Sequence, residues 1–139
     1  MYFYPVMEKI SIQIPSIPEN IRIVESFIDN AKDQFHITDD IYGNIMVAVT
    51  ESVNNAIKHG NSSDKSKNVN ISLFIEEKSI KFVVEDQGLG FDPEGLPDPT
   101  LPENINKPDG RGIFLMRNLC DGLEFSDEGR TVEMSFNMK

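Results

Sequence analysis

Alternating apolar residues in short segments constrain the fold of this chain more than any other feature. Ile10, Ile12 and Ile14 alternate with polar residues within residues 8–14, a pattern typical of a strand with one buried face. Similar apolar segments recur at 69–76, 79–86 and 130–138. Short polar turns predict that these segments, together with residues 122–126, form two antiparallel hairpins, 69–86 and 122–138.

Apolar residues spaced by threes and fours predict helices over residues 16–35, 38–59 and 111–121. We expect Ser16 and Glu19 to form a capping box at the start of the first helix. The resulting order is β-α-α-β-β-loop-α-β-β. This order predicts an α+β fold, a two-layer sandwich whose mostly antiparallel sheet is covered on one face by helices.

The length and composition suit one cytoplasmic domain. A chain of 139 residues is short for two domains, so we expect residues 1–139 to form one. The single cysteine, Cys120, excludes an internal disulfide and favours a reducing compartment. No apolar run approaches the roughly 20 residues that cross a bilayer. The short apolar start of the chain is not typical of a signal peptide, so we expect a cytoplasmic location.

The charge of the chain restricts its partners. It carries 13 Lys and Arg against 23 Asp and Glu, a formal net charge of −10. Such a protein repels phosphate backbones and anionic membranes, and no basic run offsets this. We therefore expect no direct nucleic-acid or membrane partner, while a small nucleotide stays open.

The second predicted helix carries a group of polar side chains. Glu51, Asn54, Asn55 and Lys58 lie together on the face opposite its apolar stripe. A carboxylate, two carboxamides and an ammonium could orient a hydroxyl, bind Mg²⁺ through oxygen and meet a phosphate. On this pattern alone, a solvated helix face is the simpler interpretation.

Two glycine-containing segments offer further candidate sites. Asp86 ends a predicted strand and is followed by Gly88 and Gly90, which would let the backbone approach a ligand closely. Gly110 and Gly112 open the third helix, where free N–H groups favour a phosphate. Taken singly, the first segment also suits an ordinary turn and the second a simple loop-to-helix junction.

Between them, residues 91–109 contain five of the eight prolines. A loop this long in so small a domain predicts a lid over a binding site.

Together these segments resemble a known family. In order and spacing, the chain is similar to the Bergerat-fold (GHKL) ATPases. The similarity lies in four segments: a helix with E-x-x-x-N-A-x-x-H-G, then D-x-G-x-G after a strand, then a long loop, and finally G-x-G at a helix start. The chain looks most like the stand-alone anti-sigma serine/threonine kinases of bacteria. The resemblance covers nearly the whole chain, and the P-loop, Rossmann and protein-kinase signatures are absent.

The resemblance implies a role for each matched residue. It implies that Glu51 is the general base, that Asn55 binds Mg²⁺ and that Asp86 reads the adenine amino group. The remaining nucleotide-binding positions that it implies are Lys58, Gly88, Gly90, Lys107, Gly110, Arg111 and Gly112.

The implied function is transfer of the γ-phosphoryl group of Mg·ATP to a Ser or Thr of a small anti-anti-sigma (STAS-type) protein, together with sequestration of a sigma factor. Relatives often dimerise, so a homodimer is a further expectation. Three alternatives stay open: a nucleotide-binding partner-switching module without kinase activity, the detached ATP-binding domain of a histidine kinase, and an α+β domain that binds no nucleotide.

The chain departs from the family pattern at two places. Relatives usually carry a Thr directly after the glycine that opens the last strand, but here Gly129 is followed by Arg130 and then Thr131. Because strand side chains alternate, we expect Thr131 to face away from the adenine pocket. Before the second glycine pair, Lys107-Pro108-Asp109 stands where some relatives place an arginine.

Overall fold

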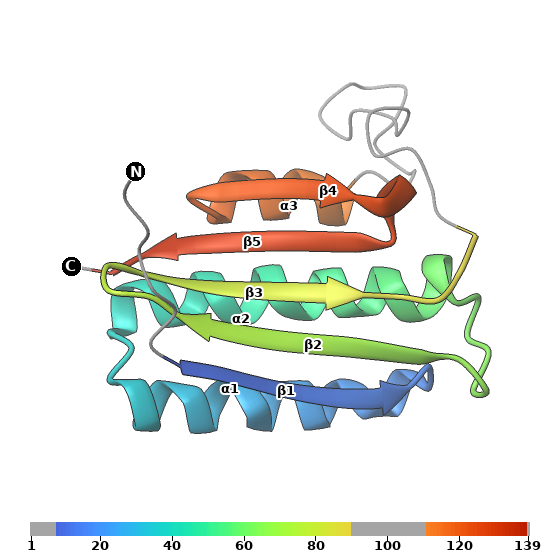
Figure 1. The fold of residues 1–139 in the computed structure, drawn as a ribbon, viewed down its shortest axis with the longest axis horizontal. Coiled ribbons are helices and arrows are strands. Elements are labelled where there is room, and N and C mark those ends of the chain that lie inside the picture. Colours follow the sequence, from blue (N-terminus) through green and yellow to red (C-terminus); the bar gives the residue numbers. More distant parts are fainter. Residues whose placement is uncertain (1–7, 90–110, 139) are drawn as a thin grey trace.

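A computed structural model describes residues 8–89 and 111–138, and for Arg111 the backbone alone. A five-stranded sheet lies in front of three helices (Figure 1). Its strand order is β1-β2-β3-β5-β4. The bounds are β1 Glu8–Pro15, α1 Ile21–Phe35, α2 Asp39–Asn55, β2 Asn68–Ile75, β3 Ser79–Glu85, α3 Arg111–Leu119, β4 Gly122–Ser126 and β5 Thr131–Asn137.

Every pair of neighbouring strands is antiparallel, and the helices cover one face of the sheet (Figure 1). This confirms the predicted α+β sandwich. Alternate residues of the central strands are buried against the helices, and the Phe82 and Phe136 rings meet edge to face with centroids 6.3 Å apart. The pairing of β3 with β5 joins the segments before and after residues 90–110 into one sheet.

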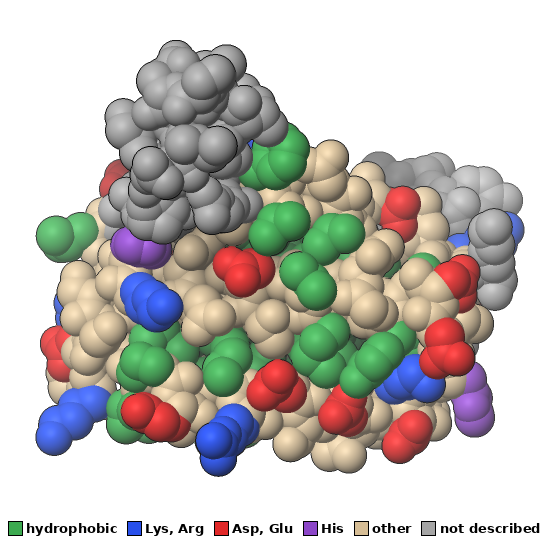
Figure 2. Space-filling view, turned by 180° about the vertical axis from the view of Figure 1, so that it is seen from behind, with side chains coloured by type: hydrophobic (Ala, Val, Ile, Leu, Met, Phe, Trp, Pro, Cys, Tyr) green, Lys and Arg blue, Asp and Glu red, His purple; other side chains and the backbone are tan. Residues whose placement is uncertain are grey.

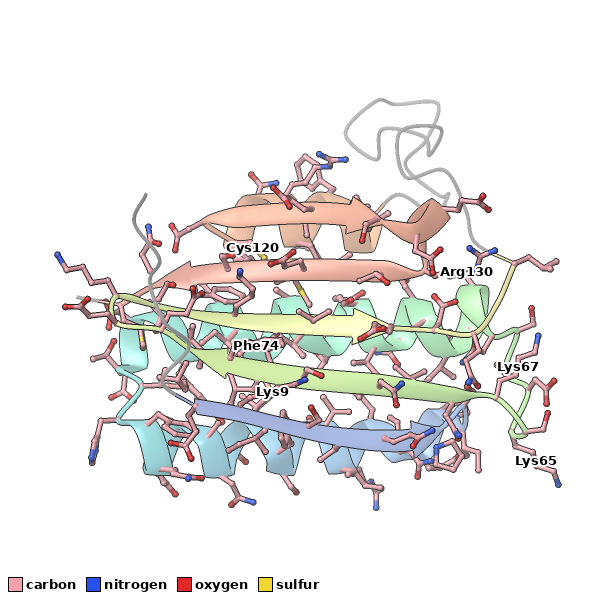
Figure 3. All side chains as sticks on the ribbon, in the orientation of Figure 1. Lys9, Lys65, Lys67, Phe74, Cys120 and Arg130 are labelled. Carbon is pink, nitrogen blue, oxygen red and sulfur yellow. The ribbon has the colours of Figure 1, made fainter. Side chains whose placement is uncertain are left out.

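The other face of the sheet carries polar side chains that pair with one another. The hydroxyls of Ser11 and Ser72 lie 3.0 Å apart across β1 and β2. Lys81 forms an ion pair with Glu133 at 2.8 Å across β3 and β5. The Lys9 ammonium lies 5.3 Å from the centre of the Phe74 ring (Figure 3). Polar alternation along the strands therefore reflects a layer with helices on one side only.

Three sequence predictions about the helices differ from the structure in detail. Ser16 does not cap a helix: its hydroxyl donates to the Lys67 carbonyl at 2.7 Å, and a 3₁₀ turn over Pro18–Asn20 precedes α1. The predicted helix 38–59 ends as an α-helix at Asn55 and continues as a π-helical turn over Ala56–Gly60. The third helix ends at Leu119, two residues before the expected boundary.

The outer side of the helices carries hydrophobic side chains scattered among charged ones (Figure 2). Each helix contributes one large exposed apolar residue: Ile23, Val47 and Phe114. Within residues 8–89 and 111–138, no helix has both the length and the apolar character needed to cross a membrane. Cys120 is half-buried, and burial raises the pKa of its thiol to about 12, with a smaller contribution from Asp121.

Candidate functional site

The start of α3 lies against two of the predicted site residues on α2. A Cβ atom on Gly112 would lie 3.0 Å from Glu51 Oε2 and 3.1 Å from Asn55 Nδ2. Any side chain at position 112 would therefore press on both groups. The predicted helix-opening glycine and the predicted carboxylate and carboxamide are neighbours in space.

A second close approach joins the end of the π-helical turn to the segment after β3. A Cβ atom on Gly60 would overlap the Asp86 carboxylate, and one on Gly88 would overlap the Gly60 carbonyl oxygen. The Gly88 N–H donates to Asp86 Oδ1 at 2.9 Å. Glycine is thus required at both positions for this loop to reach the helix.

The side chain of Asn61 holds the segment after β3 in place through hydrogen bonds. This side chain is fully buried. Its carboxamide donates to Ser16 Oγ at 2.7 Å and to the Asn68 carbonyl at 3.0 Å, and its oxygen accepts the Gln87 N–H at 2.7 Å. Because all of these bonds are made by one buried side chain, Asn61 fixes the position of the residue after Asp86.

Arg130, the residue directly before β5, lies across the site from α2. Its Nε donates to the Gly88 carbonyl at 2.8 Å, and its terminal nitrogens lie 3.2 Å from the carbonyl of Leu89 and 3.1 Å from that of Asp127. The Arg130 carbonyl in turn accepts the Asp86 N–H at 2.9 Å. Arg130 therefore ties β5 to the segment that carries the predicted base-reading aspartate.

These elements enclose a cavity of about 10 Å³, roughly the space of one water molecule. Small-molecule sites usually measure about 300–1,000 Å³, so a nucleotide base needs these walls to move apart. Arg130 and Val132 line the cavity and Thr131 does not, as the strand alternation predicted. The lining residues are Ser52, Asn55, Ala56, Val84, Asp86, Met116, Phe125, Gly129, Arg130 and Val132.

The electrostatics of Asp86 reflect this enclosure. Burial raises the pKa of its carboxyl above the ordinary value, while the Gly88 N–H and the positive charge of Arg130 lower it in part. Lys65, Lys67 and Arg130 all lie at this end of the molecule (Figure 3). Arg130 is already paired with Asp127 at 3.2 Å and with Glu128 at 3.5 Å, so its charge is partly neutralised within the protein.

Of the other predicted site residues, the structure describes only Lys58 in full. Lys58 is exposed on the π-helical turn. Gly90, Lys107, Gly110 and the side chain of Arg111 lie outside the described part of the structure, as does the predicted lid at 91–109. The nucleotide-binding roles of all these residues stay predictions.

Sequence reasoning missed Ser52 and Asn61. Ser52 is only 2% exposed, and its hydroxyl has no hydrogen-bond partner in the described structure. Asn61 directly follows Gly60, which ends the helix, so the polar segment that contains Asn61 is typical of an ordinary turn. No periodic pattern identifies either residue, because each one depends on contacts with distant segments.

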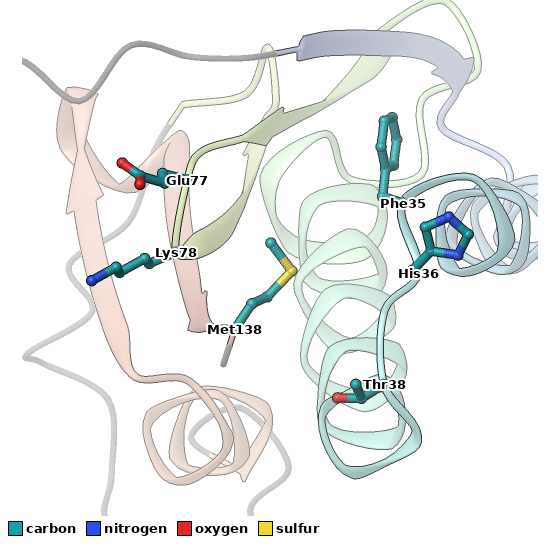
Figure 4. Close-up of a pocket in the computed structure, with 6 residues that line it drawn as sticks. All are labelled: Phe35, His36, Thr38, Glu77, Lys78 and Met138. Carbon is teal, nitrogen blue, oxygen red and sulfur yellow. The ribbon is translucent and has the colours of Figure 1, made fainter.

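A second pocket lies at the opposite end of the molecule (Figure 4). Its volume is about 510 Å³. It lies where α1 meets α2 and where β2 turns into β3, whereas Asp86 follows the far end of β3. It contains none of the predicted site residues. The residues that line it are Phe35, His36, Thr38, Glu77, Lys78 and Met138.

Comparison with known protein families assigns the chain to one of them. A sequence profile of the histidine kinase-like ATPase domain matches residues 14–136. The chain belongs to this family. The match spans α1, α2, α3 and the strands β2 to β5 up to residue 136, but only the last two residues of β1, and it confirms the resemblance to GHKL ATPases.

Two proteins named Serine-protein kinase RsbW are similar to this ATPase domain over most of its length. The protein from Oceanobacillus iheyensis is 25% identical over 125 residues, which cover 86% of this chain and 79% of that protein. The protein from Bacillus cereus is 27% identical over 135 residues, which cover 92% of this chain and 84% of that protein.

A solved structure shares the fold of this ATPase domain. The crystal structure of the RsbU and RsbW domains of a Mycobacterium tuberculosis protein matches 96% of this chain with a TM-score of 0.66. The two sequences are 12% identical, and this chain spans 32% of that longer one.

Proposed function

We propose that this protein is an ATP-dependent serine/threonine kinase and anti-sigma factor, which phosphorylates a small anti-anti-sigma (STAS-type) partner and sequesters a sigma factor. The observation that carries the proposal is the contact of Gly112 with Glu51 and Asn55, beside a cavity that Asn55 and Asp86 both line. The similar proteins named serine-protein kinases favour a serine or threonine acceptor over a histidine.

Each residue has a defined part in this reaction. Asp86 accepts a hydrogen bond from the adenine amino group, and the backbone N–H groups at the start of α3 meet the phosphates. Glu51 accepts the proton of the partner's hydroxyl as its oxygen attacks the γ-phosphorus, the bond to the β-γ bridging oxygen breaks and ADP leaves. Lys58, Lys107 and Arg111 supply cationic groups for the phosphates, and Gly90 and Gly110 let the backbone approach them.

The chemistry of the residues present fits Mg²⁺. This ion usually takes one or two protein oxygens and completes its shell with phosphate and water, and the carboxamide of Asn55 beside Glu51 offers such a partial site. Residues 8–89 and 111–138 contain no cluster of three or more His, Cys, Asp or Glu able to hold a metal unaided. When bound, Mg²⁺ neutralises charge on the phosphates.

Calorimetric titration of ATP, with and without Mg²⁺, tests the binding step. We expect micromolar binding that needs Mg²⁺ and weakens at least about tenfold in Asn55→Ala, a loss of about 1.4 kcal/mol. Asn54→Ala is the matched control, because Asn54 is the neighbouring half-buried carboxamide on α2. Absence of binding at millimolar Mg·ATP would contradict the proposal.

Transfer of label from γ-³²P-ATP to candidate anti-anti-sigma proteins tests the chemical step. We expect acid-stable label on serine or threonine, and Glu51→Gln should bind Mg·ATP but transfer little. Label that is lost in acid would indicate a histidine acceptor and the competing histidine-kinase interpretation.

A second candidate function is a nucleotide-binding partner-switching module without kinase activity. Two observations favour it: the hydrogen bonds from Arg130 to the carbonyls of Gly88 and Leu89, and the small volume of the neighbouring cavity. Under this alternative Glu51→Ala leaves control of the sigma factor intact. Under the kinase proposal the same variant loses control by the anti-anti-sigma partner.

A further inference from the structure

The hydroxyl of Ser52 is a buried polar group without a partner in the described structure. The same helix offers hydroxyls a ready partner one turn back, since Thr50 donates to the Met46 carbonyl at 2.6 Å. Ser52 makes no such bond although it is 2% exposed. An unpaired buried hydroxyl lowers stability, so a bound group that pairs with it would offset this cost.

The position of Ser52 indicates what that ligand is. Ser52 lines the same cavity as Asp86, while Val84, Met116 and Val132 give the cavity apolar walls. An apolar slot with one acceptor and one hydroxyl suits a flat heteroaromatic base that carries an amino group next to a ring nitrogen. Once the walls separate, adenine meets this description, because N1 and N7 flank its amino group.

We propose that Ser52 determines base specificity: its hydroxyl donates a hydrogen bond, directly or through one water, to an adenine ring nitrogen. That nitrogen lies beside the amino group that donates a hydrogen bond to the Asp86 carboxylate. This inference rests on the proposed function, which supplies the adenine nucleotide. Guanine presents an oxygen to Asp86 in place of the amino group, so the two side chains together select adenine.

Ser52 also supplies a hydroxyl that the opposite wall lacks. The residue after Gly129 is Arg130, and its guanidinium is directed to the carbonyls of Gly88 and Leu89. Thr131 does not line the cavity. Among the described residues that line the cavity, Ser52 is the only one with a hydroxyl.

Affinities of ATP analogues for Ser52→Ala test the proposal. The probes are ATP, 1-deaza-ATP and 7-deaza-ATP, each titrated with Mg²⁺ into wild type, Ser52→Ala and Ser72→Ala. Ser72→Ala is the matched control, because Ser72 is also buried but pairs with Ser11 on the far face of the sheet. We expect Ser52→Ala to weaken ATP binding about three- to tenfold and Ser72→Ala to leave it unchanged.

The analogues separate a direct role of the hydroxyl from a change in packing. Wild type should bind one deaza analogue more weakly than ATP, and Ser52→Ala should bind that analogue and ATP equally. Ser52→Ala should also keep or raise the melting temperature, because it removes an unpaired group. Equal ATP affinity in wild type and Ser52→Ala would overturn this inference alone, whereas no ATP binding by wild type would overturn the proposed function and this inference with it.

Discussion

Arg130 is the residue whose replacement most directly tests how the cavity opens. Its guanidinium bonds to the Gly88 and Leu89 carbonyls must break or shift before the walls can separate. Arg130→Thr removes these ties and places a hydroxyl where relatives carry one. We therefore expect Arg130→Thr to strengthen Mg·ATP binding about three- to tenfold, measured by calorimetry, and to lower the melting temperature by a few degrees.

The control for Arg130→Thr is Lys65→Thr, which removes the same charge at the same end of the molecule (Figure 3). Lys65→Thr should leave the affinity nearly unchanged. Weaker ATP binding in Arg130→Thr than in Lys65→Thr would show that the guanidinium holds the nucleotide rather than closing its cavity.

Asp86 gives a pH-dependent prediction. Burial raises the pKa of its carboxyl in the folded protein, so proton uptake favours the folded state. Wild type should therefore gain stability relative to Asp86→Asn as the pH falls through this raised pKa towards the unfolded value. Above that pKa the buried charge destabilises, and Asp86→Asn should melt at the same temperature or higher.

Thermal melts of both proteins between about pH 3.5 and pH 7 measure this difference. ATP affinity should move the opposite way: it should decrease with protonation of Asp86, because the charged carboxylate is the stronger acceptor. A melting-temperature difference that does not change with pH would contradict the raised pKa.

At the residue scale, the sequence predicted groups with a positional motif and missed groups defined by tertiary contacts. Asp86 and Gly88 were identifiable because a strand end followed by spaced glycines has a local signature. Asn61 was not, because its importance comes from three bonds to segments that precede and follow it. Likewise, no sequence pattern tells which buried serine lacks a partner.

The start of α3 carries a prediction for a whole element. Gly112→Ala favours the helix by propensity, but its methyl group would press on Glu51 and Asn55. We expect Gly112→Ala to keep a near-normal melting temperature and to bind Mg·ATP at least about tenfold more weakly, a difference of about 1.4 kcal/mol measured by calorimetry.

Gly43→Ala is the matched control for this element. Gly43 lies in α2, and a Cβ atom added to it would meet no atom within 4 Å, so alanine there should stabilise the protein by about 0.5–1 kcal/mol and leave ATP binding intact. Normal ATP binding by Gly112→Ala would show that the approach of α3 to α2 does not matter for the nucleotide.

Among the elements, strands and helices were predictable where periodicity was strong, and their ends were not. The start of α1 was wrong because the Ser16 hydroxyl bonds to Lys67 and Asn61, both far along the chain, instead of to its own helix. The change from α2 to a π-helical turn after Asn55 was not predictable, because it accompanies the close approach of Gly60 to Asp86, which comes from a distant segment.

The whole molecule carries a prediction about cooperativity. β3 pairs with β5 and α2 packs on α3, so the segments on either side of residues 90–110 share one core. We expect a single unfolding transition in urea, with coincident curves from far-UV circular dichroism and from tyrosine fluorescence. Two separated transitions would contradict the expectation of one domain over residues 1–139.

The π-helical turn Ala56–Gly60 determines how the helix is wound between Asn55 and Gly60. The Asn61 N–H bonds to the Ala56 carbonyl five residues back at 2.8 Å, where a regular helix would reach four. A bond of this kind spans one residue more than a regular helical bond, so deleting one residue here would let the turn close as a regular α-helical turn. A homologue one residue shorter within 56–60 would therefore keep its asparagine and its glycine in phase on a regular helix, whereas this chain accommodates the additional residue in the wider π-helical turn.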